Sequence, residues 1–308
     1  MTPQSANPQS TNPQSANPQP ANPQSTNPQA EDPWLGLVVG NSRLHWAAFA
    51  GTRWLGTWHT PHGTPAQGQA LIEAGFAEGA WEPWAVEAVE WAAEAAKGRS
   101  GGGRLPLPWR ATPPQLWLAS VVQDQGAIWA TYPRCTRVTT DQVPLKNRYP
   151  TLGVDRALAL VGAGDVYGWP VLVVDGGTAL TLTAGADQGL VGGAILPGLR
   201  AQFRALHDYT DGLPLVVPAL ASLPPRWATT TAEAMVSGVV YGQLAGLRDF
   251  IADWRQHSPQ GRVVFTGGDG ATLATALIDQ TPPWQDFLHI DAALMFWGLR
   301  VCRQQGQS

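Results

Sequence analysis

Two stretches of the sequence repeat one pattern, in which an apolar strand is followed by a glycine turn and a second strand. Residues 38–44 (VVGNSRL) can be laid over residues 175–181 (DGGTALT), which places Gly40 on Gly177. A further strand follows each copy, and helices then alternate with strands. We expect this duplication to produce two similar domains with a cleft between them. The alternation of strands and helices predicts the α/β class.

Hydrophobic periodicity predicts the elements of both halves. In the first half we expect strands over residues 35–39, 43–51, 52–60, 116–122 and 136–140, and helices over residues 66–78, 83–97, 125–132 and 154–168. In the second half we expect strands over residues 171–177, 178–185, 191–196 and 262–268, and helices over residues 198–208, 230–257 and 291–304, with one more helix after the turn that ends the strand at 262–268. The predicted domains are therefore residues 34–168 and 169–308.

The N-terminal segment differs from the rest of the chain. Residues 1–30 contain no charged residue, and from Asn7 onward they repeat a five-residue unit of proline and small polar residues. Such a segment cannot bury enough apolar surface to offset its conformational entropy. We predict that residues 1–33 form a disordered tail, and the period is too short for a solenoid.

The charge, the apolar runs and the cysteine content exclude several classes of protein. The chain has 19 Lys+Arg against 23 Asp+Glu, a formal net charge of −4, whereas nucleic-acid-binding proteins usually carry a basic face. No apolar run approaches the ~18 residues that span a bilayer, and the N-terminus lacks the pattern of a signal peptide. Cys135 and Cys302 are the only cysteines, which excludes a disulfide framework and a CxxC metal site. We expect a soluble cytoplasmic protein with no nucleic-acid or membrane partner.

Tryptophan is unusually frequent. The chain has 15 tryptophans, ten of them between Trp34 and Trp129. They allow either a tryptophan-lined ligand site or a tryptophan-rich core. We favour the core, because tryptophan readily fills protein interiors.

Three glycine turns each follow an apolar strand. They are Gly40-Asn41-Ser42, Asp175-Gly176-Gly177-Thr178 and Thr266-Gly267-Gly268-Asp269. Glycine lets the backbone approach a ligand closely, and exposed N–H groups beside a Ser or Thr hydroxyl can cradle phosphate oxygens. One such turn is also typical of an ordinary hairpin. Three of them, two related by the internal repeat, indicate a nucleotide-phosphate site between the domains. The GxxxxGK[ST] motif is absent, which excludes a Walker-type loop.

Two acidic residues occupy informative positions. Asp175 ends a predicted strand directly before a glycine turn, where it could hold a cation or simply cap the turn. Asp155 begins a predicted helix, where a catalytic role and a favourable interaction with the helix dipole are about equally good explanations. Arg156 beside it could pair with a substrate carboxylate.

These and other motifs together resemble one family, type III pantothenate kinase. The resemblance covers about residues 34–300 and depends on the order and spacing of all the motifs, because no single one is decisive. The matching motifs are Gly40-Asn41-Ser42-Arg43-Leu44, Gly153-x-Asp155-Arg156, Asp175-x-Gly177-Thr178-Ala179-x-Thr181, Gly192-Gly193-x-Ile195-x-Pro197-Gly198, Thr231-x-Glu233-Ala234-Met235-x-Ser237-Gly238 and Thr266-Gly267-Gly268.

The resemblance implies a fold and an activity. The fold would be two ribonuclease H-like domains of the acetate and sugar kinase/actin superfamily, flanking a nucleotide cleft. The reaction would be the ATP-dependent phosphorylation of pantothenate, the first step of coenzyme A biosynthesis. The resemblance further implies a homodimer that uses Mg²⁺ and a monovalent cation, K⁺ or NH₄⁺.

The resemblance also assigns roles to particular residues. Asp155 would be the general base that takes the proton of the pantothenate hydroxyl, and Asp175 would bind the monovalent cation. The residues implied to contact pantothenate are Tyr149, Gly153, Val154, Asp155, Arg156 and Thr231. The residues implied to contact ATP are Gly40, Asn41, Ser42, Arg43, Thr178, Gly267 and Gly268.

Two positions depart from the family pattern. Val38 stands where the family usually has an aspartate near Mg²⁺-ATP, and Thr230 stands where an asparagine usually precedes Thr231. A valine cannot bind a cation. Two alternatives to the kinase therefore stay open, namely a non-catalytic nucleotide-binding regulator of the same fold and a kinase that acts on another small hydroxy acid.

Overall fold

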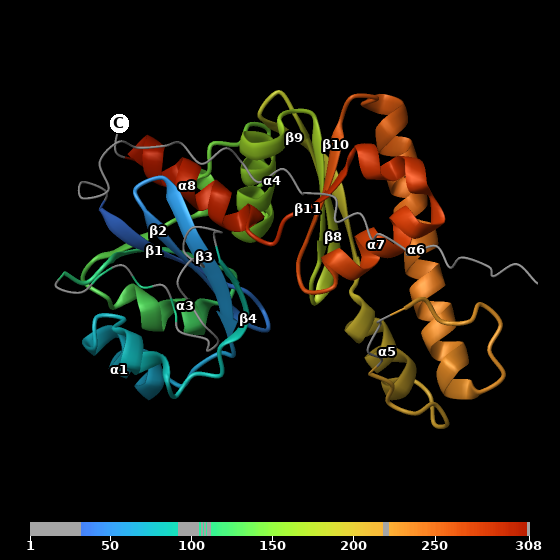
Figure 1. The fold of residues 1–308 in the computed structure, drawn as a ribbon, viewed down its shortest axis with the longest axis horizontal. Coiled ribbons are helices and arrows are strands. Elements are labelled where there is room, and N and C mark those ends of the chain that lie inside the picture. Colours follow the sequence, from blue (N-terminus) through green and yellow to red (C-terminus); the bar gives the residue numbers. More distant parts are fainter. Residues whose placement is uncertain are drawn as a thin grey trace, which may run out of the picture.

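The computed structural model describes residues 32–91, 105, 107, 109, 112–217 and 222–306 (Figure 1). The tail predicted over residues 1–33 therefore lies almost entirely outside the described residues, as does the end of the helix predicted over residues 83–97. The described chain forms two sheets with helices packed against both, so the predicted α/β class is confirmed.

The two sheets share one topology. The strands of the first sheet are β1 (Pro33–Val39), β2 (Leu44–Ala50), β3 (Arg53–Thr60), β4 (Glu87–Trp91), β5 (Gln115–Ser120) and β6 (Cys135–Arg137), in the order β4-β3-β2-β1-β5-β6. Those of the second are β7 (Val171–Gly176), β8 (Ala179–Ala186), β9 (Gly189–Pro197), β10 (Arg262–Thr266) and β11 (Leu288–Ile290), in the order β11-β10-β7-β8-β9. In each sheet three antiparallel strands are followed by two strands parallel to the first. The duplication seen in the sequence is therefore a duplication of topology, with β4 added at one edge.

The helices form layers outside and between the sheets (Figure 1). They are α1 (Pro65–Glu73), α3 (Gln123–Ala130), α4 (Val154–Tyr167), α5 (Leu199–Asp208), α6 (Thr231–His257), α7 (Gly270–Gln280) and α8 (Leu294–Gly306), with short 3₁₀ turns at Glu78–Trp81, Thr140–Gln142 and Pro282–Asp286. One core joins α1 and α3 to the first sheet, and another joins α5, α6 and α7 to the second. A third core contains α4, α8 and residues from both sheets, so these two helices form the layer between the sheets.

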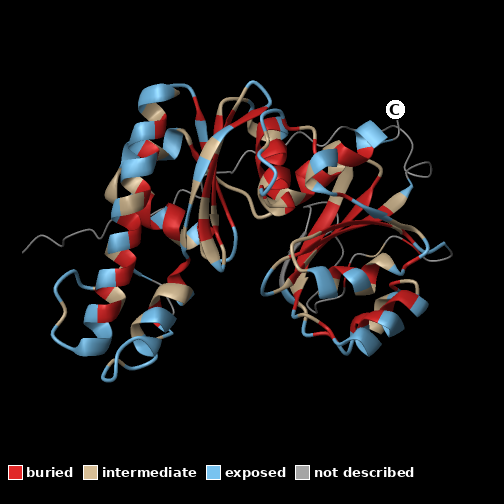
Figure 2. Cartoon of the chain, turned by 180° about the vertical axis from the view of Figure 1, so that it is seen from behind, coloured by how far each residue is buried: buried red, intermediate tan, exposed pale blue. Residues whose placement is uncertain are grey.

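The packing of α4 on α8 is unusually close. A Cβ added to Gly162 would lie 2.1 Å from the carbonyl oxygen of Leu294, and one added to Gly298 would lie 2.1 Å from that of Leu158. Figure 2 shows α4 as largely buried, in keeping with its position between the sheets. This layer fixes the start of α4, where Asp155 lies, against both sheets.

The helix predicted over residues 83–97 is wrong where the structure describes it. Residues 87–91 form β4, which pairs antiparallel with the edge of β3. The segment EAVEW has a helical spacing and does not alternate as a half-buried strand would, so pairing with a non-local partner outweighed the local pattern. Other differences are smaller. The helix predicted to reach residue 78 ends at Glu73, because the backbone turns left-handed at Gly75 (φ +58°), and β11 was not predicted.

The tryptophan-rich region is mostly core. Trp34, Trp46, Trp58 and Trp129 are fully buried. Trp46 stacks on Trp58 at 6.4 Å between ring centroids and meets Trp129 edge-on at 4.9 Å. Trp46, Trp58 and Trp129 fill the space between the first sheet and its outer helices, and Trp34 lies in the core between the two sheets, so the tryptophans form core as the favoured interpretation predicted.

Candidate functional site

The first two glycine turns meet across the middle of the molecule. The backbone N–H of Gly40 donates to the carbonyl of Arg43 at 3.0 Å, which closes the turn between β1 and β2. The hydroxyl of Ser42 lies 2.7 Å from that of Thr178, which sits in the turn between β7 and β8. Both hydroxyls are exposed. Two turns 136 residues apart thus form one polar surface, as a site between two domains requires.

The third turn packs directly against the second. Thr266 pairs with Asp175 in the parallel ladder of β10 and β7, and the N–H of Asp269 donates to the carbonyl of Gly176 at 2.8 Å. Gly267 has φ +81°, and a Cβ there would lie 2.2 Å from the Asp175 carboxylate. A glycine is therefore required at this position, both for the backbone and for the space.

Asp175 and Asp155 form an acidic pair behind these turns. Burial, together with the nearby charge of Asp155, raises the pKa of Asp175 to about 7. Burial also raises the pKa of Asp155, although the backbone N–H of Arg156, 2.8 Å from its Oδ1, works in the opposite direction. Among the described residues no hydrogen-bond donor reaches the side chain of Asp175. A carboxylate with no donor and a second carboxylate nearby is a setting that a bound cation would stabilise.

Arg156 ties the start of α4 to the second sheet. Its Nε donates to the Thr183 hydroxyl at 3.0 Å, and one terminal nitrogen donates to the Tyr149 hydroxyl at 2.8 Å. The other terminal nitrogen lies 3.4 Å from the carbonyl oxygen of Leu182. Gly153 is the N-cap of the same helix. The structure therefore brings Tyr149, Gly153, Asp155 and Arg156 together, with Arg156 already engaged by acceptors of the protein.

Two predicted residues lie apart from these contacts. Arg43 forms an ion pair with Glu87 at the edge of the first sheet. Thr231 begins α6, and its side chain is exposed, while Thr230 caps the helix by accepting from the N–H of Glu233. In the ranges that the structure describes, no hydrogen bond joins Thr231 to the other predicted site residues.

Histidines near the first turn were missed by the sequence analysis. Nε2 of His62 lies 2.8 Å from the carbonyl oxygen of Gly40, and Nδ1 of His45 lies 2.9 Å from Nδ1 of His59. In the sequence the six histidines are scattered, and each one alone looks like a surface or packing residue. The signal that could have found this pair was strand register, since His45 and His59 face each other across β2 and β3.

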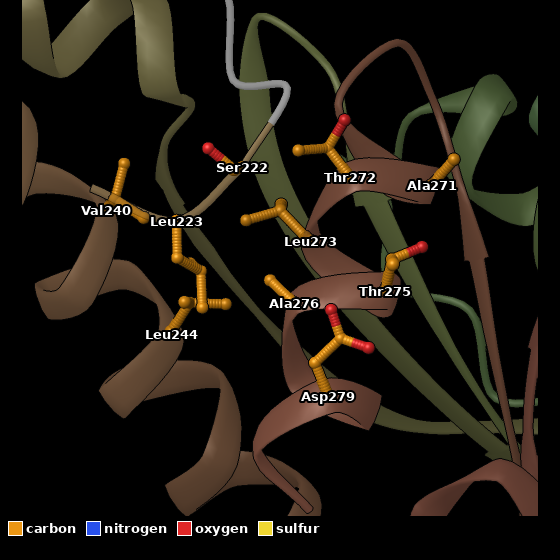
Figure 3. A pocket seen from close by; sticks show the side chains of 10 residues that line it. All are labelled: Ser222, Leu223, Val240, Leu244, Ala271, Thr272, Leu273, Thr275, Ala276 and Asp279. Carbon is orange, nitrogen blue, oxygen red and sulfur yellow. The ribbon is translucent and has the colours of Figure 1, made fainter. Parts of the chain in front are cut away.

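Two cavities lie near the candidate site. One, of about 300 Å³, lies between α6 and α7, starting just after the third turn (Figure 3). Val240 and Leu244 line one wall, and Thr272, Ala276 and Asp279 line the other. The second, of about 320 Å³, lies at the ends of β5 and β6 and reaches Gly153 and Val154 at the start of α4. One cavity thus adjoins the glycine turns, and the other adjoins Asp155.

The described residues contain neither a metal-ligand cluster nor a membrane-spanning helix. Within the described ranges, no three His, Cys, Asp or Glu side chains gather as a metal cluster would require. Asp175 and Asp155 remain the acids of the site that could hold a cation together with phosphate oxygens, water or backbone carbonyls. Within the same ranges, none of the helices combines the length and apolar character needed to cross a bilayer.

Comparison with known proteins gives a consistent result. The family model for type III pantothenate kinase matches residues 113–253. A type III pantothenate kinase from a Nostoc species is 44% identical over 271 residues, covering 87% of this chain and 93% of the relative. One from a Synechocystis species is 41% identical over 263 residues, covering 83% and 87%.

A solved structure supports the fold alone. The Campylobacter jejuni protein described as a conserved Baf family transcriptional activator superposes with a TM-score of 0.52 at 17% sequence identity. The match covers 89% of this chain and 98% of that one. At this identity the likeness extends to the arrangement of the two sheets and their helices and not to the chemistry.

Proposed function

The chain belongs to the type III pantothenate kinase family, and from that premise we propose that it transfers the γ-phosphoryl group of ATP to the hydroxyl of pantothenate with Asp155 as general base. The observation that carries the proposal is the contact between Ser42 and Thr178. It brings two glycine turns together in front of the two acids, where phosphates and an acceptor hydroxyl could meet.

The reaction needs little covalent chemistry from the protein. The acceptor oxygen attacks the γ-phosphorus, the bond to the β–γ bridging oxygen breaks, and ADP leaves. Asp155 accepts the hydroxyl proton and later releases it to solvent. Its raised pKa suits this role, because a base whose pKa is closer to the working pH is a stronger proton acceptor. The Arg156 N–H bonded to Asp155 fixes the orientation of the carboxylate.

The substrates would occupy the two sides of the paired turns. We place the ATP phosphates on the N–H and hydroxyl groups of the first two turns, with Arg43 nearby. The adenosine would lie at Gly267 and Gly268, with its base toward the cavity of Figure 3. We place pantothenate in the cavity beside Gly153 and Val154. Residues 34–168 and 169–308 would be the two domains that enclose this cleft.

The residues present fit the cations that the family implies. The partly buried carboxylate of Asp175 has no described hydrogen-bond donor and is next to another acid, so it would hold K⁺ or NH₄⁺. Mg²⁺ usually binds through one or two carboxylates plus phosphate oxygens, and Asp155 and Asp175 are the carboxylates at hand. When bound, Mg²⁺ would offset the charge on the phosphates.

A homodimer and a cytoplasmic location complete the proposal. Thr231 is exposed, and among the described residues no hydrogen bond joins it to the other site residues, so we propose that it serves the site of a second copy. The strand β9 offers a surface for such a copy, because Val191 and Ile195 are 63% and 65% exposed on one face.

The test is ATP consumption with and without pantothenate, in K⁺ and in Na⁺. We expect turnover that needs pantothenate and K⁺, and a fall of about 10²- to 10⁴-fold in kcat for Asp155→Asn. Asp165→Asn is the matched control, because Asp165 lies on the same helix but pairs with Arg300. Absence of pantothenate-dependent turnover in either salt would contradict the proposal.

The buried Val38 favours one competing function. Because Val38 stands where the family usually has an aspartate, the first turn has no carboxylate to hold a cation. A nucleotide-binding regulator without catalysis would not need one. A thermal-shift screen separates the two, since pantothenate should stabilise the kinase and nucleotide alone should stabilise the regulator. Stabilisation by another hydroxy acid, and not by pantothenate, would point to a kinase with a different acceptor.

A further inference from the structure

The backbone of the first glycine turn is held from behind by a histidine. His62 lies in the loop after β3 and is partly buried, and its Nε2 is 2.8 Å from the carbonyl oxygen of Gly40. Because a carbonyl only accepts, His62 must be the donor. A peptide unit is planar and trans, so its C=O and N–H point in opposite directions. Holding the Gly40 carbonyl toward His62 therefore directs the N–H of Asn41 away from it.

The N–H of Asn41 is free to meet a ligand. Within the part of the chain that the structure describes, no acceptor takes it, whereas the N–H of Gly40 is used to close the turn. The hydroxyl of Ser42, the next residue, lies 2.7 Å from that of Thr178 in the second turn. If the Gly40 carbonyl were released, the peptide could rotate and present an oxygen where a phosphate should bind.

Two further histidines lie beneath the same turn. The β-sheet register places Val38 opposite His45 and His45 opposite His59, and directly opposed residues share one face of a sheet. A Cβ added to Gly40 would lie 3.1 Å from Nε2 of His45. Burial lowers the pKa of His45 to about 3, with His59, Arg43 and His62 adding to the effect, so His45 packs under the turn as a neutral ring.

We propose that His62 is a positioning residue for ATP, which directs the Asn41 N–H toward the phosphates by holding the Gly40 carbonyl over the His45–His59 pair. The inference rests on the proposed function, because it assumes that the first turn binds phosphates. It assigns a role to a residue that lies outside the paired turns and the acidic pair.

The experiment compares three variants of the full chain. His62→Leu removes the donor, and His62→Gln keeps an N–H near the position of Nε2. His207→Leu is the matched control, because the Nδ1 of His207 lies 2.9 Å from a backbone carbonyl, that of Leu213, on the exposed helix α5. Binding of a Mg²⁺-loaded non-hydrolysable ATP analogue is measured by calorimetry, and KM and kcat are measured for both substrates.

We expect His62→Leu to weaken analogue binding and raise the KM for ATP by roughly 3- to 10-fold, as loss of one hydrogen bond would. The KM for pantothenate and the melting temperature should change little. His62→Gln should recover most of the loss, and His207→Leu should match the wild type.

Several results would overturn the inference. They are unchanged analogue binding in His62→Leu, equal losses of analogue binding in the Leu and Gln variants, and a rise in the KM values for both substrates together with a lower melting temperature. Failure of the wild type to bind the analogue would also overturn it. A wild type that binds the analogue but shows no pantothenate-dependent turnover would contradict the proposed function alone, because the binding comparison still decides the role of His62.

Discussion

The two related glycine turns differ at one residue, which lies two positions before Gly40 in the first turn and two positions before Gly177 in the second. In the first turn this residue is Val38, which is fully buried in the core between the sheets. In the second it is Asp175, whose pKa burial raises to about 7. The same backbone unit therefore provides N–H and hydroxyl donors in one half, and in the other it adds a carboxylate. Duplication supplied two similar turns, and one side chain decides whether each suits an anion or a cation.

The turns also differ in what supports them. The first is backed by side chains, through the His62 contact with Gly40. The second is backed by the main chain, since the N–H of Asp269 donates to the carbonyl of Gly176. A turn supported by a side chain can be loosened by one substitution, whereas a turn supported by backbone resists most of them. We expect this difference to appear in mutational data.

The largest effect should follow the removal of the charge that distinguishes the second turn. Asp175→Asn should lower kcat/KM by about 10²- to 10³-fold, in line with the loss of one preorganised electrostatic group. The variant should also lose its response to K⁺. Steady-state kinetics in K⁺ and in Na⁺ tests this, with Asp187→Asn, at the positive-φ turn after β8, as the control. A variant that keeps its K⁺ dependence would remove the cation role from Asp175.

Making the first turn resemble the second should reduce stability. Val38→Asp places a carboxyl in a fully buried site, and we expect a loss of about 3 kcal/mol in the free energy of unfolding. Urea unfolding at pH 8 measures it, and Val38→Ala separates the packing loss from the cost of the polar group. A stable Val38→Asp protein with tighter Mg²⁺-ATP binding would mean that this position opens to the nucleotide.

Most of the fold could be predicted because its signals are local. The apolar runs and glycine turns around Gly40 and Gly177 gave the three-stranded unit of each sheet, and the repeat predicted that the two sheets would match. The strand β4 could not be predicted in this way. Its backbone pairs with the edge of β3, and only the folded sheet provides that partner.

The same difference between local motifs and non-local contacts applies to the candidate site. The turns and the acidic residues were predicted, because each motif is contiguous in the sequence. The partners of Arg156 and the role of His62 depend on contacts between separate elements. In particular, Arg156 was predicted to pair with a substrate carboxylate, and the structure shows that Thr183 and Tyr149 already accept from it. Whether it also contacts the substrate stays a prediction.

A smaller effect should appear in how stability depends on pH. A carboxyl with a raised pKa keeps its proton in the folded state after the unfolded chain has lost it, so the folded protein loses stability as pH rises toward about 7. We expect a loss of about 2 kcal/mol between pH 5 and pH 8 from Asp175, which K⁺ should reduce. Urea unfolding at both pH values, with and without K⁺, measures it. Asp175→Asn should flatten the profile, and an unchanged profile in that variant would assign the effect to other groups.

The smallest effect tests whether the two turns meet in solution. Ser42→Ala and Thr178→Ala each remove one hydroxyl of an exposed pair 2.7 Å apart, so each loss should be modest. Their coupling in a double-mutant cycle of ATP binding should be about 0.5–1 kcal/mol, because each hydroxyl has already lost its partner once the other has been removed. Ser42→Ala combined with Ser237→Ala is the control, since Ser237, on α6, donates to the carbonyl of Arg226 in the preceding loop. That pair should be additive. Additivity in the Ser42–Thr178 cycle as well would mean that the two turns bind phosphate independently. The first and second turns would then be two separate half-sites.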